Sequence, residues 1–311
     1  MIPTAARQVD SHTPGTPEWL QQRRTRLGGS EIAAVLGLSP YESRFSLWHR
    51  KLDMVGPVDD NPVMEWGRRL ESAVLAKFFE DHSDLDHLGR GSWIHPRHDF
   101  MLASPDAIAA DRSGSLVVVD AKTGSDMGPE WGDAPPVWYV CQLRWYMEVL
   151  GAQEAWVAAL LDGRTYREYR IEPDPADAAL MITEGRDFIA SLAAGRRPGI
   201  DDHSQTYQVL RDLHPDIDAG TEVTVPSEIA GEYLDAVLCL KAAESRLTGA
   251  KSRLLDAMGN ARVAVVEGPG PAVDRRFAYR RAAGADATPY PTYYPKALAR
   301  LSAELNEGTA A

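Results

Sequence analysis

Three charged side chains between residues 104 and 122 have the types and the spacing for chemistry on a phosphodiester. Asp106 stands in a Ser-Pro-Asp tripeptide, and Asp120 and Lys122 end a Val-rich segment. Side chains on a strand alternate between faces, so Asp120 and Lys122 are expected on the same face of a sheet. Two nearby carboxylates bind hard divalent ions such as Mg²⁺, and a lysine beside them can orient or deprotonate water or stabilise developing charge.

The segment that ends in Asp120 is expected to be a strand. Residues 116–119 read LVVV and follow the turn-forming stretch DRSGS at residues 111–115. A metal held at the end of this strand would neutralise the phosphodiester and supply hydroxide near neutral pH. A Pro-Asp followed by a strand ending in acid-x-Lys is the metal-nuclease pattern PD-(D/E)xK. The alternative interpretation is a solvated strand end at a sheet edge.

Two expected helices carry further candidates. Residues 64–80 have helical spacing of apolar positions, and Glu71 falls in the row of Gly67, Leu75 and Phe79. An acid there needs a partner, either a salt bridge to Arg68 or Arg97 or a place as a third carboxylate at the metal site.

The second of these helices is expected at residues 138–150. Its core stripe consists of Val140, Leu143, Met147 and Leu150. Gln142 lies off that stripe, so by itself it is expected to be a surface residue.

Near the amino end, Ser30 is expected to cap a helix that covers residues 32–36 and stops at Gly37. Arg23 and Arg24 precede it. A helix amino terminus with nearby guanidinium groups can bind a phosphate. The alternative is an ordinary cap beside a solvated basic turn.

Five motifs occur in a recognisable order along the chain: GGSEIAAVLGLSPYES, MEWGRRLE, ASPDAI, VVVDAKT and a YVCQL helix that ends MEVLG. In this order they resemble the YqaJ and lambda exonuclease family of viral recombination nucleases, over about residues 17–190. Several motifs in sequence are more specific than any one of them alone.

The resemblance implies roles for named side chains. Asp106 and Asp120 would be metal ligands, with Glu71 as a further acid, and Lys122 would be the catalytic lysine. Gln142 would complete the site as a supporting amide. The second acid is more often Glu in this family, so Asp120 is a departure that would shift the metal by roughly one methylene.

The resemblance also implies how the chain would meet DNA. Arg23 and Ser30, with Arg24 beside them, would hold the 5′-phosphate of a duplex end. The expected activity is Mg²⁺-dependent 5′ to 3′ degradation of one strand, with Mn²⁺ as a substitute ion. Expected partners are double-stranded DNA ends, a single-strand annealing protein and further copies of the chain in a ring such as a trimer. The alternatives are an end-trimming or site-cutting endonuclease and a non-catalytic DNA-end-binding protein.

The length is sufficient for one sizeable α/β domain and a smaller appendage. The resemblance implies an α/β fold with a PD-(D/E)xK restriction-endonuclease-like core, in which helices flank a mixed β-sheet, and a helical C-terminal appendage follows it. The expected organisation of the 311 residues is a disordered tail at 1–16, a nuclease domain at 17–195, a connector at 196–226, a long helix with a β-hairpin at 227–281 and a mobile tail at 282–311.

Charge and cysteine content bear on the partners and the compartment. The formal charge of −12 is unusual for a nucleic-acid binder. It suits an enzyme that binds DNA loosely outside its channel and lets metal supply positive charge. Two cysteines indicate reduced cytoplasmic thiols and not a disulfide framework. The resemblance implies a phage- or prophage-encoded protein in the cytoplasm of a bacterial host. No apolar run is long enough for a membrane span.

The carboxy-terminal region has a seven-residue repeat. From Ser227 onward, one position of the repeat holds Tyr233, Leu240, Leu247 and Leu254, and the other holds Ala236, Ala243, Ala250 and Ala257. The helix either self-associates or docks on its own nuclease domain. Residues 263–266 and 277–279 are expected to form a hairpin around the turn at 268–271, and the arginines near it either touch DNA or are solvated.

Overall fold

The computed structural model describes the whole chain except residues 1, 3, 14, 59, 126–130, 268–274, 282–289 and 295–311. The chain divides into two compact units. The first comprises Met1–Asp126 and Glu130–Ile217, and the second comprises Met127–Pro129 and Asp218–Ala311. The division falls inside the predicted connector, and the predicted domain boundaries stay predictions.

A five-stranded mixed sheet is the centre of the first unit. Its strand order is β3-β6-β7-β8-β9, with bounds Asp86–Gly89, Ala107–Ala110, Leu116–Gly124, Glu154–Leu161 and Thr165–Ile171. Strands β7 and β8 are parallel and the other neighbours are antiparallel. The turn between β6 and β7 is fixed by Asp111, whose Oδ1 accepts the backbone N–H groups of Ser113 and Ser115. Because Gly114 has φ +85° there, the sequence DRSGS makes the predicted turn.

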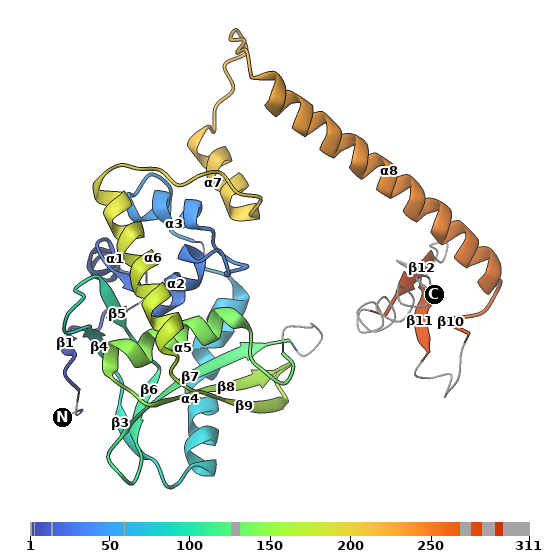
Figure 1. Cartoon of the computed structure of the whole chain (residues 1–311). Coiled ribbons are helices and arrows are strands. Elements are labelled where there is room, and N and C mark those ends of the chain that lie inside the picture. Colours follow the sequence, from blue (N-terminus) through green and yellow to red (C-terminus); the bar gives the residue numbers. More distant parts are fainter. Residues whose placement is uncertain are drawn as a thin grey trace. The chain divides into compact units, whose positions relative to one another are not determined.

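Helices cover both faces of this sheet (Figure 1). Helix α4 (Pro62–Asp81) packs Val74 and Phe78 against Val117 and Val119. Helix α5 (Val137–Leu150) packs in the larger core against the opposite face of β7. The side chains on that face alternate along the strand with Val117 and Val119. The parallel pair β7 and β8 is joined through α5, as a parallel pair requires a crossover. The predicted mixed sheet with flanking helices is confirmed.

A second, four-stranded sheet in the same unit has the order β1-β4-β5-β2, with bounds Arg7–Val9, Ser92–Ile94, Met101–Ala103 and Leu27–Gly28. Strand β1 lies in the segment predicted to be a disordered tail, so that prediction is wrong for these residues. The reason is tertiary: β4 offers an edge, and Arg7–Val9 pairs with it in antiparallel register.

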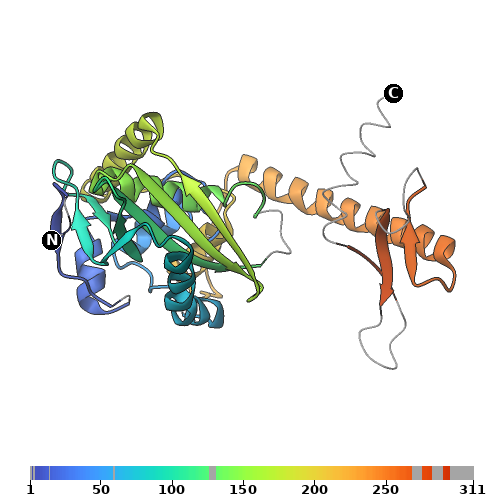
Figure 2. The same ribbon diagram turned by 90° about the horizontal axis from the view of Figure 1, so that it is seen from below.

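The remaining helices of the first unit are α1 (Pro17–Arg23), α2 (Gly29–Val35), α3 (Arg44–Lys51), α6 (Pro175–Ala193) and α7 (Ser204–Leu213). Helix α7 lies within the predicted connector, where the sequence shows few apolar runs. It is ordered by packing on α3, and the buried hydroxyl groups of Thr206 and Ser43 lie 2.7 Å apart. Figure 2 shows the same unit from below, with α4 toward the viewer.

The second unit contains the long helix α8 (Ser227–Met258) and an antiparallel sheet of β10 (Val263–Val265), β11 (Arg276–Arg281) and β12 (Tyr290–Tyr293). The predicted helix start at Ser227 and the pairing of β10 with β11 are confirmed, whereas the predicted turn at residues 268–271 lies outside the described residues. Strand β12 lies in the segment predicted to be a mobile tail, so that prediction is wrong for these residues, which are ordered by pairing with β11. Among the described residues, no helix combines the length and hydropathy needed to cross a bilayer.

Candidate active site

Two carboxylates meet at the open end of the β6–β7 hairpin. The register places Ala107 opposite Val119, so Asp106, which directly precedes β6, lies opposite Asp120. Asp106 accepts a hydrogen bond at Oδ2 from the backbone N–H of Ala121, at 2.9 Å. Asp120 is 1% exposed and forms an ion pair with Lys122 Nζ. The prediction that Asp120 and Lys122 share a face is therefore confirmed.

The electrostatics of this cluster favour an added positive charge. Burial and the neighbouring Asp120 raise the pKa of Asp106 well above its ordinary value, with a further contribution from Glu71 and an opposing one from Lys122. Burial alone would lower the pKa of Lys122, but Asp120 and Asp106 outweigh it and raise this pKa. Lys122 is therefore protonated, and its single charge faces more than one carboxylate.

These donors fit a magnesium ion. Mg²⁺ prefers oxygen ligands and is usually held by one or two carboxylates, with waters and substrate phosphate oxygens completing the shell. Asp106 and Asp120 provide such a pair. No group of three His, Cys, Asp or Glu side chains within the described part of the chain converges closely enough to hold a metal.

Glu71 stands at the margin of this cluster. It comes from α4, its side chain is 27% exposed, and its carboxylate lies 3.3 Å from the guanidinium of Arg90. The expected salt bridge to Arg68 or Arg97 is not formed, because Arg68 pairs with Asp60 and Arg90 is the partner instead. Glu71 lies within electrostatic range of Asp106, and its role as a metal ligand stays a prediction.

Helix α5 contributes a buried amide and a phenol. Gln142 is 7% exposed, which corrects the expectation of a surface position, and its Nε2 donates to Tyr146 Oη at 3.0 Å. The cause is close packing of α2 on α5: a Cβ added at Gly29 would lie 2.5 Å from the Tyr146 ring. The sequence could not show that α5 is covered on this side as well as on its sheet side.

Tyr146 was not among the residues singled out from the sequence. Burial and Asp120 raise its pKa, while Lys122 and Arg23 oppose the shift. Tyr146 therefore lies within electrostatic range of both the carboxylate pair and Arg23. The available signal was its spacing of four residues from Gln142 on the same helix face.

Arg23 occupies a confined place beside α2. It is 8% exposed, its guanidinium lies over the ring of Trp19 at 4.4 Å, and one amino group is 3.5 Å from Glu31. Its buried Nε has no hydrogen-bond partner among the described residues. Arg23 is therefore a largely buried cation with one donor that the described residues leave unused.

The other two predicted phosphate-binding residues are placed differently. Helix α2 begins at Gly29 with Gly28 as its N-cap, so Ser30 is not the capping residue. The Glu31 carboxylate accepts the Gly28 N–H at 2.7 Å at this helix start, and Ser30 is exposed. Arg24 is exposed and forms an ion pair with Asp53. Roles for Ser30 and Arg24 stay predictions.

Comparisons with known proteins agree with the resemblance seen in the motifs. The YqaJ-like viral recombinase domain matches residues 18–153. An uncharacterized protein YqaJ of Bacillus subtilis (strain 168) is 30% identical over 207 residues, which cover 62% of this chain and 62% of that protein.

Two solved structures are also similar in part. An alkaline exonuclease from Laribacter hongkongensis, LHK-Exo, has a TM-score of 0.47 and 23% identity, covering 58% of this chain and 94% of that one. A phage related exonuclease from Haemophilus somnus 129PT has a TM-score of 0.42 and 12% identity, covering 55% and 96%.

Proposed function

We propose that this chain, whose residues 18–153 match the YqaJ-like viral recombinase domain, is a Mg²⁺-dependent exonuclease that degrades one strand of duplex DNA from an end. The observation that carries the proposal is the cluster of Asp106, Asp120 and Lys122 on one face at the end of the β6–β7 hairpin. Each residue type serves phosphodiester hydrolysis, and the excess negative charge favours a divalent cation.

The charge and chemistry of each residue indicate its role in the proposed reaction. Asp106 and Asp120 would hold the ion, and a bound Mg²⁺ would supply charge neutralisation and an activated water. Lys122 is protonated in its pair with Asp120, so its role is to stabilise negative charge that develops on the phosphate. Gln142 and Tyr146 both come from α5 and are joined by a hydrogen bond. They would orient reacting groups at the carboxylate pair.

Arg23 supports a preference for ends. Arg23 is largely buried and lies within electrostatic range of Tyr146, and it is our candidate holder of a terminal 5′-phosphate. We therefore favour degradation from an end, with 5′ to 3′ polarity, over cutting at internal sites. Delivery of the single-stranded product to an annealing protein, assembly into a ring and replacement of Mg²⁺ by Mn²⁺ belong to the same proposal.

The test compares linear duplex with covalently closed circular duplex of the same sequence. Both are incubated with Mg²⁺, with Mn²⁺ and with chelator, and the products are sized. The proposal predicts mononucleotides from the linear form alone, and none with chelator. Cutting of the circle would favour the endonuclease alternative, and binding of ends without hydrolysis would favour the non-catalytic one.

A further inference from the structure

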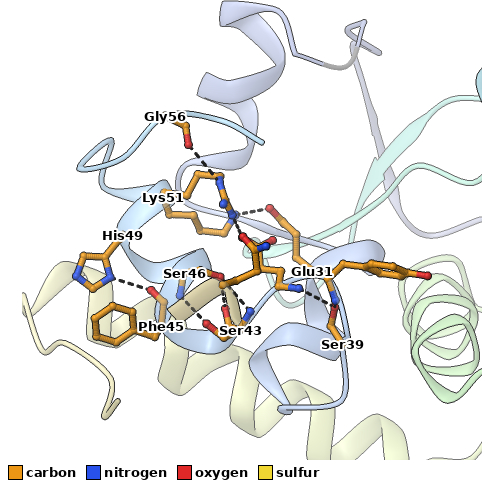
Figure 3. Close-up of polar contacts among 12 residues, drawn as sticks. Glu31, Ser39, Ser43, Phe45, Ser46, His49, Lys51 and Gly56 are labelled. Carbon is orange, nitrogen blue, oxygen red and sulfur yellow. Dashed lines mark hydrogen bonds and ion pairs between the residues drawn. The ribbon is translucent and has the colours of Figure 1, made fainter. Parts of the chain in front are cut away.

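Lys51, the last residue of α3, sits at the centre of a buried polar cluster. Its Nζ donates to the backbone carbonyls of Arg23 at 2.9 Å and Arg26 at 2.8 Å, and to Glu31 Oε1 at 2.9 Å. An ammonium has three donors, so all of them are used. Figure 3 shows Lys51 and Glu31 pointing toward one another from α3 and α2.

The cluster is ionic although it is shielded from water. The Lys51 side chain is 5% exposed and that of Glu31 is 14% exposed. Burial alone would raise the pKa of Glu31, but Lys51 and Arg23 outweigh it and lower this pKa, so the carboxylate is charged. A buried ion pair seldom adds net stability over apolar packing, because both charges lose hydration. Its presence calls for a reason other than stability.

The partners of Lys51 suggest the reason, because they hold Arg23 at both ends. The carbonyl of Arg23 binds Lys51 directly, while the guanidinium of Arg23 faces the same Glu31 carboxylate that Lys51 binds. The space is tight, since a Cβ at Gly28 would lie 2.3 Å from a guanidinium nitrogen. A small displacement of the main chain at Arg23 would therefore move the guanidinium.

Helix α3 provides a rigid support for Lys51. Ser43 and Ser46 exchange hydrogen bonds of 2.9 Å at its amino end (Figure 3), and His49 Nδ1 bonds the carbonyl of Phe45 at 2.8 Å. The side chains of Ser43, Ser46 and His49 are all buried. The position of Lys51 Nζ is thus fixed by its own helix as well as by its partners.

We propose that Lys51 is a positioning residue for recognition of the DNA 5′-phosphate: it holds the main chain of Arg23 and the Glu31 carboxylate so that the Arg23 guanidinium faces a terminal phosphate. This inference rests on the proposed phosphate-binding role of Arg23. It adds a residue from α3, which lies outside the motifs that pointed to the site.

The experiment measures binding without cleavage. Blunt duplexes of one sequence, with either a 5′-phosphate or a 5′-hydroxyl, are titrated by fluorescence anisotropy in EDTA, and the ratio of the two Kd values is compared between variants. Wild type is expected to prefer the phosphate by about tenfold or more. Lys51→Met is expected to bring the ratio within about twofold of one while leaving the Kd for the 5′-hydroxyl duplex unchanged, a split that a general loss of structure would not produce. Lys77→Met, which removes an exposed pair with Asp81, is the matched control and should keep the full preference.

Folding is monitored by circular dichroism, because Lys51→Met leaves Glu31 buried without its main partner. If that variant does not fold, the double variant Glu31→Gln with Lys51→Met removes both charges, and its ratio is expected to fall in the same way. A folded variant of either kind that keeps the wild-type ratio would overturn the role of Lys51. Equal affinities in the wild type would instead refute the phosphate pocket and any positioning of it, whereas failure of Mg²⁺-dependent cleavage alone would refute only the proposed hydrolysis.

Discussion

Asp106 lies opposite Asp120 across the β6–β7 hairpin, and it is the Asp106 carboxyl whose pKa rises because burial and its neighbour both oppose ionisation. Ionisation of both carboxyls therefore destabilises the metal-free fold at neutral pH. The same pair is what a divalent cation would bind. The candidate site therefore lowers the stability of the metal-free fold, and this loss can be measured.

Asp106→Asn should abolish cleavage and leave the metal-free fold at least as stable as wild type near pH 7. A carboxyl with a raised folded-state pKa contributes its stability below the unfolded value of 3.8 and loses it as pH rises through the folded value. The advantage of the variant should therefore shrink as pH falls toward about 4. Thermal unfolding in EDTA across this pH range measures it.

Asp111→Asn is a control whose effect on stability at neutral pH should have the opposite sign. Hydrogen bonds from Ser113 and Ser115 lower the pKa of Asp111, so its carboxylate supports the fold above the unfolded pKa. That variant should be less stable at neutral pH and retain cleavage. A destabilised Asp106→Asn protein at pH 7 would contradict the electrostatic account of the pair.

Mg²⁺ should stabilise the folded wild type by mass action, by about 2.7 kcal/mol when its concentration is about one hundred times Kd. The Asp120→Asn variant should lose most of this effect, because the remaining carboxylate is a poorer site. Calorimetric unfolding with and without Mg²⁺ makes the comparison. Equal stabilisation of both proteins would place the ion elsewhere.

Lys122→Met should lower kcat by roughly 10²- to 10³-fold while Mg²⁺ still binds, since a cation that stabilises developing charge acts mainly in the transition state. Single-turnover cleavage and Mg²⁺ titration give the two quantities separately. A Kd for Mg²⁺ that worsens as much as the rate would assign Lys122 a structural role. Lys77→Met serves as the surface control.

Arg23→Ala should remove a preference for 5′-phosphorylated over 5′-hydroxyl duplex of about tenfold or more, since a charge-assisted hydrogen bond contributes about 1.5–3 kcal/mol. The rates of cleavage of the two duplexes give the preference. Arg69→Ala, at an exposed pair with Glu65, should keep it. If the Arg23 variant still discriminates, the phosphate is held by other residues.

Ala243→Glu on α8 should reduce assembly and processivity together while leaving Mg²⁺ binding unchanged. The repeat carries large apolar side chains, and Tyr233, Leu240 and Leu247 are 70%, 60% and 54% exposed in the single chain. A glutamate at the small position would block close approach of another helix. Light scattering and product lengths on long DNA provide the measurements, and a monomeric wild type that degrades processively would refute the ring.

Several elements are encoded locally by alternation and turn chemistry, so they can be predicted from the residues alone. The strand that ends at Asp120 and Lys122, the turn made by DRSGS and the helix that starts at Ser227 are local features, and each forms as expected. The shared face of Asp120 and Lys122 follows from the period of a strand alone.

The surroundings of these elements depend on packing between segments that are far apart in the chain. Gln142 is buried because α2 covers a face of α5 that its own periodicity leaves polar, and Arg7–Val9 is ordered because β4 offers an open edge. The contacts of Lys51 join residues that are twenty or more positions apart, and the partner of Glu71 is Arg90. Such contacts depend on which elements pack together, a long-range outcome that local spacing does not encode.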